Sequence, residues 1–219
     1  MKENTGRYRT ATGIEGQSEP GSRGRVLRNL LGIQRKRDMD LAEFEALVRT
    51  QTLYLRQFTP ETRLTAAAIC DMHRAWLGSI YEWAGRYRTV ELEKGGFRWP
   101  PAFRVPENMA VFEKGLLRKY TPCRPATLAE VARRIAEVHA ELLMIHPFRD
   151  GNGRLARWLA DIMAFQAGFP APAYRFQGRG GRREGERYLA AVKKGYRLEF
   201  DDLTAFFREA IERRTREGE

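Results

Sequence analysis

Hydrophobic side chains recur every three or four residues through much of this chain, the spacing that places them on one face of an α-helix. The longest such face consists of Leu128, Val131, Ile135, Val138, Leu142 and Ile145. Thr127 and Glu130 have the spacing of a capping box, which marks a helix N-terminus. We therefore predict a buried helix over residues 128–145 that leads directly into His146.

Other segments of the chain also predict helices. They lie at about residues 40–55, 59–80, 105–120, 155–165, 188–196 and 201–213. The second is expected to begin at Thr59-Pro60, because threonine is a favoured N-cap and proline suits the first turn. Residues 88–101 differ, since alternating side chains flank Lys94-Gly95-Gly96 as two strands flank a turn. The predicted fold class is all-α, a helical bundle with one small β-hairpin.

The length of 219 residues suits one domain with short appendages. Residues 1–24 are rich in Gly, Ser, Arg and Thr, and we expect them to form a flexible basic arm. One domain is expected over residues 25–213, followed by a tail at residues 214–219. The net charge is +11, and more than half of it comes from residues 1–37, which hold nine basic and three acidic side chains.

Nothing in the sequence indicates a membrane protein. No apolar run is long enough for a membrane-spanning helix, and the N-terminus has no apolar stretch typical of a secretory signal. Cys70 and Cys123 lack metal-ligand spacing to each other or to the histidines. We expect reduced thiols in a cytoplasmic protein, with export by a specialised secretion route left open.

The most informative segment is residues 146–157, His-Pro-Phe-Arg-Asp-Gly-Asn-Gly-Arg-Leu-Ala-Arg. Its glycines let backbone N–H groups approach phosphate oxygens where a loop meets a helix N-terminus, and its two arginines lie on one helix face. Its single carboxylate suits Mg²⁺, and a histidine at a helix end can act as a base. The candidate site residues are His146, Asp150, Gly151, Asn152, Gly153, Arg154 and Arg157. They predict a site for a metal-bound polyphosphate.

This segment resembles the signature of the Fic family, His-x-Phe-x-(Asp/Glu)-Gly-Asn-Gly-Arg-x-x-Arg, and every defined position is filled. The similarity extends from about residue 26 to about residue 207. It includes residues 80–89, which are similar to a Tyr-x-Trp-Ala-Gly-x-x-Arg segment that precedes the family's flap. The resemblance implies a Fic-type helical bundle and a protein adenylyltransferase.

The resemblance also implies a role for each motif residue. His146 would deprotonate a Tyr, Thr or Ser hydroxyl of a target protein, and that oxygen would attack the α-phosphate of ATP. Mg²⁺ held by Asp150 would bridge the α- and β-phosphates, and Asn152 with the loop amides would stabilise the transferred group. Arg154 and Arg157 would bind the pyrophosphate that leaves. The product would be a target protein carrying AMP.

The hairpin at residues 88–101 matches the position of the family's flap, which docks a target segment by strand addition. The candidate docking residues are Glu91, Leu92, Glu93, Lys94, Gly95, Gly96, Phe97 and Arg98. Tyr188 begins a helix where the family places adenine-pocket side chains, and a core tyrosine would give the same pattern. His73 and His139 lie within predicted helices, where packing or hydrogen bonding is the expected role.

Many family members are restrained by an inhibitory helix, (Ser/Thr)-x-x-x-Glu-(Gly/Asn), whose glutamate pairs with the second motif arginine, here Arg157. Glutamates followed by Gly or Asn occur in this chain, but none has Ser or Thr four residues earlier; they include Glu15, Glu107, Glu184 and Glu217. We therefore expect a toxin-like or effector-like enzyme, with any inhibitor supplied as a separate, antitoxin-like protein.

Two other functions stay open. A Fic-fold phosphotransferase or another nucleotidyl transferase would use the same motif, although the phosphate-transferring relatives carry lysine where this chain has Gly153. A basic nucleic-acid-binding protein is suggested by the charge and by arginine tracts at residues 35–37 and 178–183. The aromatic RNA-binding and zinc patterns are missing, so we expect a protein rather than nucleic acid or a membrane as partner.

Overall fold

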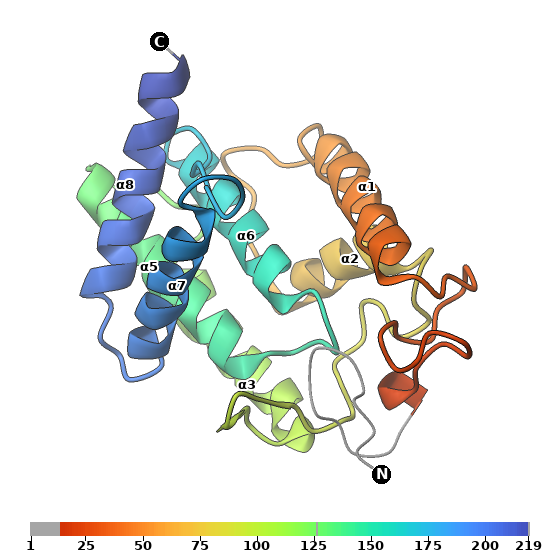
Figure 1. Cartoon of the computed structure of the whole chain (residues 1–219). Coiled ribbons are helices and arrows are strands. Elements are labelled where there is room, and N and C mark those ends of the chain that lie inside the picture. Colours follow the sequence, from red (N-terminus) through yellow and green to blue (C-terminus); the bar gives the residue numbers. More distant parts are fainter. Residues whose placement is uncertain (1–13, 126, 219) are drawn as a thin grey trace. The chain divides into compact units, whose positions relative to one another are not determined.

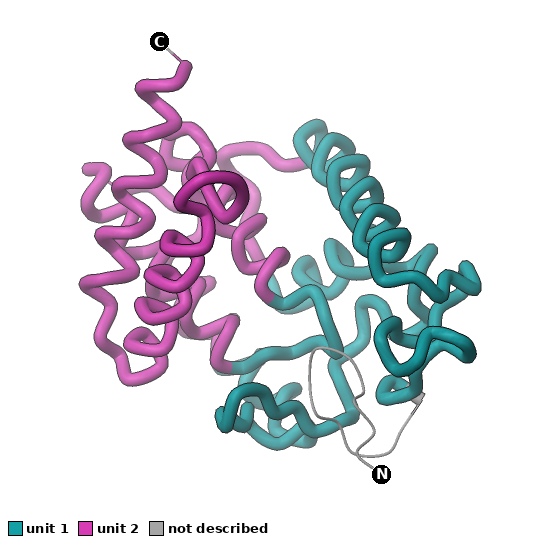
Figure 2. Tube along the Cα trace, in the orientation of Figure 1, with its two compact units in different colours: residues 1–57, 65–111, 145–152 teal, residues 58–64, 112–144, 153–219 magenta. Residues whose placement is uncertain are grey.

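The computed structural model describes residues 14–125 and 127–218. These residues form helices joined by loops, with one two-stranded antiparallel sheet, which confirms the predicted fold class (Figure 1). The chain divides into two compact units (Figure 2). Unit 1 comprises the residues up to 57, residues 65–111 and residues 145–152; unit 2 comprises residues 58–64, residues 112–144 and the residues from 153 onward.

Unit 1 contains α1 (Lys36–Tyr54) and α2 (Ala66–Leu77), which pack against each other. The Thr65 hydroxyl caps α2 by accepting a hydrogen bond of 3.0 Å from the Ala68 N–H. The predicted helix start at Thr59 is therefore wrong. Thr59 instead lies in a turn, where its N–H donates to the hydroxyl of Thr62 at 2.9 Å.

An apolar cluster joins Val26 and Leu27 to the helices of unit 1. It consists of Val26, Leu27, Met39, Ala46, Trp76, Leu77, Ile80, Tyr81, Trp83 and Ala84. Glu43 is also buried; its backbone carbonyl accepts a hydrogen bond from Trp76 Nε1–H at 2.8 Å, and its carboxylate accepts one from the Tyr81 hydroxyl at 2.6 Å. These hydrogen bonds help to make the buried acid compatible with its apolar surroundings.

The predicted basic arm over residues 1–24 falls partly outside the described residues, since residues 1–13 are not among them. Residues 14–24 differ from the expectation of a flexible arm. Residues Ile14–Gly16 form a short 3₁₀ helix, and Ser18 pairs with Leu27 in an isolated bridge. The Glu19 carboxylate accepts the Asn29 N–H at 3.1 Å. These contacts hold residues 14–24 against residues 27–29. Amino-acid composition alone does not reveal such contacts.

The predicted hairpin is present, with shorter strands than its alternating sequence suggested. Strands β1 (Glu93–Lys94) and β2 (Phe97–Arg98) pair Glu93 with Arg98 and Lys94 with Phe97. Gly95 and Gly96 connect them with φ values of 56° and 78°, and glycine is the residue best suited to two successive left-handed positions. Val90, Leu92 and Trp99 form a buried cluster of their own beneath the hairpin.

The remaining helices follow the predicted order. After a short 3₁₀ turn come α3 (Val105–Phe112), a π-helical turn (Glu113–Leu117), α4 (Arg118–Tyr120), α5 (Leu128–Ile145), α6 (Asn152–Gln166), α7 (Gly181–Gly195) and α8 (Asp201–Gly218). The capping box before α5 is present, since the N–H of Glu130 donates to the Thr127 hydroxyl at 3.3 Å and its carboxylate accepts the Thr127 N–H at 3.1 Å. Helix α7 begins earlier than predicted, and α8 occupies residues that were expected to form a tail.

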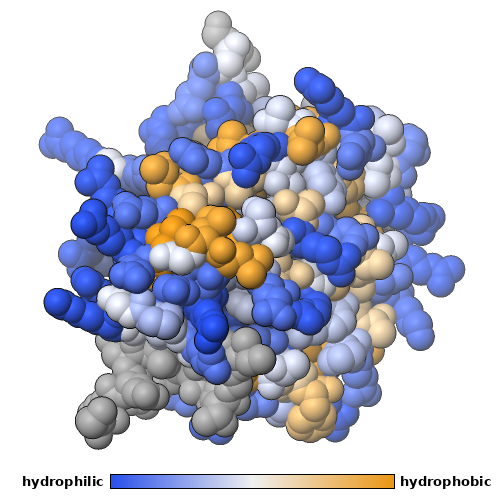
Figure 3. Space-filling model, turned by 90° about the vertical axis from the view of Figure 1, so that its right-hand side faces the viewer, coloured by the Kyte–Doolittle hydropathy of each residue, from blue (hydrophilic) through white to orange (hydrophobic). Residues whose placement is uncertain are grey.

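Part of the apolar sequence of α1 faces the surface. Leu41, Phe44 and Val48 are 55%, 60% and 45% exposed, and their spacing places them on one face of the helix. Figure 3 shows a side of the molecule on which hydrophobic residues gather among hydrophilic ones. Within the described residues, every helix is too short or too polar to cross a membrane.

A close approach between two helices of unit 2 gives a first testable prediction. A Cβ atom at Gly195 in α7 would lie 2.8 Å from Ala140 Cβ in α5, whereas one at Gly115 would have no neighbour within 4 Å. Gly195→Ala should lower the free energy of unfolding by about 1–3 kcal/mol, because the helices must move apart. Gly115→Ala, the control, should be neutral or slightly stabilising. Equal effects of the two variants in urea unfolding would contradict this packing.

Candidate active site

The motif of residues 146–157 crosses from unit 1 to unit 2 between Asn152 and Gly153 (Figure 2). Unit 1 therefore carries His146, Asp150, Gly151 and Asn152. Unit 2 carries Gly153, Arg154, Arg157 and Tyr188. The two groups of residues are held by different neighbours.

His146 follows the last residue of α5 and has a φ of 52°, a left-handed conformation that is uncommon for a residue with a side chain. Arg88 holds this backbone. Its Nε donates to the His146 carbonyl at 2.8 Å, and its own N–H donates to the Pro147 carbonyl at 2.8 Å. The imidazole itself is buried and lies against the ring of Trp99, with 4.1 Å between ring centroids.

Arg88 is buried and uses all sides of its guanidinium. In addition to the His146 carbonyl, its Nη1 binds the Val90 carbonyl at 2.9 Å and its Nη2 binds the Pro100 carbonyl at 2.5 Å. Burial lowers the pKa of Arg88, and the nearby carboxylates of Glu91 and Glu15 raise it. Arginine remains charged in proteins, so this fork joins the loop to both ends of the hairpin as a cation.

No role was predicted for Arg88. It is the final residue of the Tyr-x-Trp-Ala-Gly-x-x-Arg segment, and that position is the signal in the sequence that could have indicated it. Its partner His146 is 58 positions away in the sequence, so the contact depends on the tertiary structure.

His73 supports the same loop from α2. Its ring stacks on Phe148 with 3.9 Å between centroids and 8° between planes. The Gly85 N–H donates to Nδ1 at 2.9 Å, and Nε2 lies 3.0 Å from the Asp150 carbonyl. Because a backbone N–H can only donate, Nδ1 is the acceptor, and Nε2–H is the donor to Asp150. His73 thus has the hydrogen-bonding role expected from the sequence.

The Asn152 side chain is hydrogen-bonded to the backbone of the same loop. Its Oδ1 accepts the Phe148 N–H at 2.9 Å, and its Nδ2 donates to the Phe148 carbonyl at 2.7 Å. The side chain is 1% exposed. The resemblance implies that Asn152 stabilises the transferred group; in the structure its amide bridges the loop across four residues.

Position 151 requires a glycine for two reasons, its left-handed backbone conformation and the close approach of neighbouring side chains. Its φ is +86°, and a Cβ atom would lie 2.9 Å from the Trp76 ring and 3.2 Å from His73 Nε2. Its N–H donates to the Asp150 carboxylate at 2.5 Å. Asp150 itself is half-buried. No group of three His, Cys, Asp or Glu side chains that could hold a metal occurs in the described part of the chain.

In unit 2, α6 carries Arg154 and Arg157 three residues apart, so they lie on one face of the helix. The Arg157 guanidinium lies over the rings of Tyr174 and Phe176, at 5.9 Å and 5.4 Å from their centroids. Aromatic faces attract a guanidinium, which restricts where this cation can point. A half-buried carboxylate that the sequence did not suggest, Asp161, follows one turn later, and desolvation raises its pKa to about 7.

Tyr188 lies in the same unit and is buried, with its ring close to Phe176 and Phe206. Its hydroxyl is 2.7 Å from His139 Nε2, while His139 Nδ1 is 3.1 Å from the Ala156 carbonyl. Burial lowers the pKa of His139 to about 3, so the ring is neutral at pH 7. Nδ1–H therefore donates to Ala156, and Nε2 accepts the Tyr188 hydroxyl.

Two of the glutamates considered as inhibitory candidates also lie in unit 2, and both are engaged by other arginines. Glu184 accepts from Arg213 Nη1 at 2.9 Å and from the Arg175 N–H at 3.0 Å. Burial alone would raise the pKa of Glu184, but these hydrogen bonds lower it. Glu217 forms an ion pair with the Arg175 side chain.

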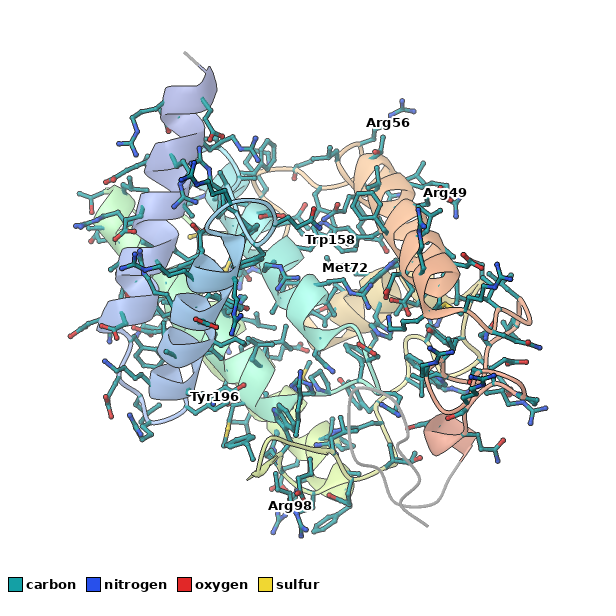
Figure 4. All side chains as sticks on the ribbon, viewed as in Figure 1. Arg49, Arg56, Met72, Arg98, Trp158 and Tyr196 are labelled. Carbon is teal, nitrogen blue, oxygen red and sulfur yellow. The ribbon has the colours of Figure 1, made fainter. Side chains whose placement is uncertain are left out.

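The candidate docking residues of the hairpin divide between core and surface. Leu92 is fully buried, and the Glu91 carboxylate accepts a hydrogen bond of 2.9 Å from the Ala102 N–H. Lys94, Gly95 and Gly96 at the turn are exposed. The Arg98 side chain is 75% exposed and extends from the hairpin, where it pairs weakly with Glu93 at 3.4 Å (Figure 4). The sheet has two strands, so each retains an outer edge.

The two hydrogen bonds of His73 can be tested separately. His73→Gln can keep a donor near the position of Nε2, whereas His73→Asn keeps only an acceptor near Nδ1. Both variants lose the stack on Phe148, but the Asn variant also leaves the Asp150 carbonyl without its donor. We expect the Asn variant to be less stable than the Gln variant by about 1–3 kcal/mol in urea unfolding. Equal stabilities would show that the Asp150 contact contributes nothing.

The chain was compared with known proteins. The Fic/DOC family model matches residues 63–164. A probable protein adenylyltransferase of Sinorhizobium fredii is 28% identical over 85% of this chain and 91% of its own length. The protein adenylyltransferase Fic of Nematostella vectensis is 35% identical over 53% of this chain, and VbhT of Bartonella schoenbuchensis is 30% identical over 66%. The chain spans only 26% and 30% of these last two proteins.

Solved structures show the same fold. The BepC protein of Bartonella tribocorum with bound AMPPNP has a TM-score of 0.68 at 20% identity, covering 84% of this chain and 91% of that one. The N-terminal FIC domain of Bep8 from Bartonella sp. 1-1C has a TM-score of 0.70 at 16% identity, covering 85% and 90%. The complete motif begins inside the segment that the Fic/DOC family model matches, and its residues 146–157 lie wholly within residues 63–164.

Proposed function

We propose that this protein is an adenylyltransferase that moves AMP from ATP to a Tyr, Thr or Ser hydroxyl of a target protein. The observation that carries the proposal is the motif of residues 146–157, in which every defined position of the Fic signature is filled. The relatives named above support it, since all three carry the name protein adenylyltransferase.

The reaction follows from the chemistry of the motif. His146 takes the proton from the target hydroxyl, and the oxygen attacks the α-phosphorus of ATP. A bond forms between that oxygen and the α-phosphorus, and the bond from the α-phosphorus to the bridging oxygen breaks. Pyrophosphate leaves with the electron pair, and the target keeps the AMP group. Such a transfer depends mainly on positioning and on stabilising charge.

The basic residues of α6 would hold the part of ATP that leaves. Arg154 and Arg157 lie on one helix face near the N-terminus of α6, where backbone N–H groups and the helix dipole also favour an anion. Gly151 and Gly153 would allow phosphate oxygens to approach the backbone. Tyr188 belongs to the aromatic group around Arg157 and would form part of the surface for the adenine ring.

Magnesium is the cofactor that this chemistry requires. Asp150 is the only carboxylate of the loop, and it is half-buried with one oxygen on the Gly151 N–H. One carboxylate together with phosphate oxygens and water is a usual way to hold Mg²⁺, so the residue fits this role. When bound, the ion would neutralise charge that develops on the phosphates.

The hairpin would dock the target, and a separate protein would restrain the enzyme. A target segment adding to an outer edge of β1 or β2 would be bound mainly through its backbone. The engagement of Glu184 and Glu217 by Arg213 and Arg175 supports an enzyme without a built-in inhibitory glutamate. We therefore propose a toxin-like or effector-like protein whose inhibitor, if it has one, is a second chain.

A phosphotransferase is the second candidate, and labelled ATP separates the two. Cell lysate is incubated with the protein and ATP labelled at the α- or the γ-phosphate, with His146→Ala as the inactive control. We expect protein-bound label from the α-position only, and a loss of at least about 100-fold in the variant, the scale of a removed general base. Label from the γ-position alone would overturn adenylyl transfer. Equal labelling by the variant would overturn the role of His146.

A further inference from the structure

The hairpin and His146 are in direct contact through Trp99. The centroids of the indole and imidazole rings are 4.1 Å apart, and the ring planes are tilted by 35°. Both side chains are buried, with exposures of 8% for Trp99 and 4% for His146. Trp99 immediately follows β2, so a residue of the proposed docking element touches the proposed base.

The position of the Trp99 ring is set by the hairpin itself. The Trp99 N–H donates to the Leu92 carbonyl at 3.1 Å, which extends the strand pairing by one rung. Phe97 packs edge-on against the indole, with 5.1 Å between centroids and 81° between planes. Val90 and Leu92 complete the cluster. The indole therefore cannot turn away from His146 without disrupting the core of the hairpin.

The orientation of the imidazole matters for the proposed role of His146. Arg88 fixes the His146 backbone through its carbonyl, and two side-chain torsions decide where the ring nitrogens point. A general base works only within hydrogen-bond reach of the proton that it removes. The flat face of Trp99 limits both torsions. It also attracts the imidazolium that forms when the proton has been taken.

We propose that Trp99 is a positioning residue for His146, so that the element that docks the target also orients the base. The inference rests on the proposed function and deepens it. A target strand added to β1 or β2 would stabilise the hairpin, and with it the indole that holds the imidazole. Docking of the target is thereby coupled to the orientation of the His146 imidazole.

The test compares Trp99→Phe, which keeps an aromatic face, with Trp99→Leu, which keeps only an apolar side chain. The assay measures the apparent kcat and the KM for ATP in the transfer of α-label to the proteins of a cell lysate, together with the Kd for ATP. We expect Trp99→Leu to lower kcat by about 10- to 100-fold with little change in the Kd for ATP, because only orientation is lost. Trp99→Phe should retain kcat within about 3-fold. A Leu variant as active as the Phe variant would overturn the proposal.

A second measurement does not depend on activity. The side-chain protons of His146, assigned by comparison with His146→Gln, should show a ring-current shift in the NMR spectrum of the wild-type protein. The shift should persist in Trp99→Phe and disappear in Trp99→Leu. Unchanged His146 resonances in the Leu variant would overturn the positioning role. An absence of α-label transfer by the wild-type protein would instead overturn the proposed function.

Discussion

The buried guanidinium of Arg88 is the interaction on which the rest of the candidate site depends. A buried charge is costly unless its donors are satisfied, and Arg88 meets this condition with three carbonyls, those of His146, Val90 and Pro100. The first belongs to the loop after α5, and the other two belong to the two ends of the hairpin. A single side chain therefore fixes the left-handed backbone of His146 and closes the base of the hairpin.

The loop itself is held from two more directions, and this changes the interpretation of the motif. Asn152 binds the backbone of Phe148, and His73 binds the carbonyl of Asp150 while stacking on Phe148. Gly151 lies too close to Trp76 for any side chain. Asn152 and Gly151, two of the candidate site residues, thus also support the shape of the loop. Sites that must position a phosphate benefit from such pre-organised support.

Local patterns explain which parts of the fold could be predicted. Helix α5 and the hairpin were predicted because a capping box and a Gly-Gly turn specify them within a few residues. The start of α7 was missed because residues 181–187 contain no apolar side chain. Thr59 and Thr65 are equally good N-caps in sequence, and only the structure distinguishes them. A hydrogen-bonding role was expected for His73, but local patterns could not identify its partner Asp150, 77 positions away, or the partner of Arg88, 58 positions away.

The central claim is that Arg88 joins the hairpin to the loop, and hydrogen exchange tests it most directly. Arg88→Lys keeps the charge but cannot reach three carbonyls at once, whereas Arg86→Lys changes an exposed arginine whose guanidinium donates to the Glu82 carbonyl at 2.7 Å. We predict faster amide exchange over residues 89–101 and residues 146–152 together in Arg88→Lys, with α1 and α2 unchanged and no effect of Arg86→Lys. Faster exchange in only one of the two segments, or in neither, would contradict the account.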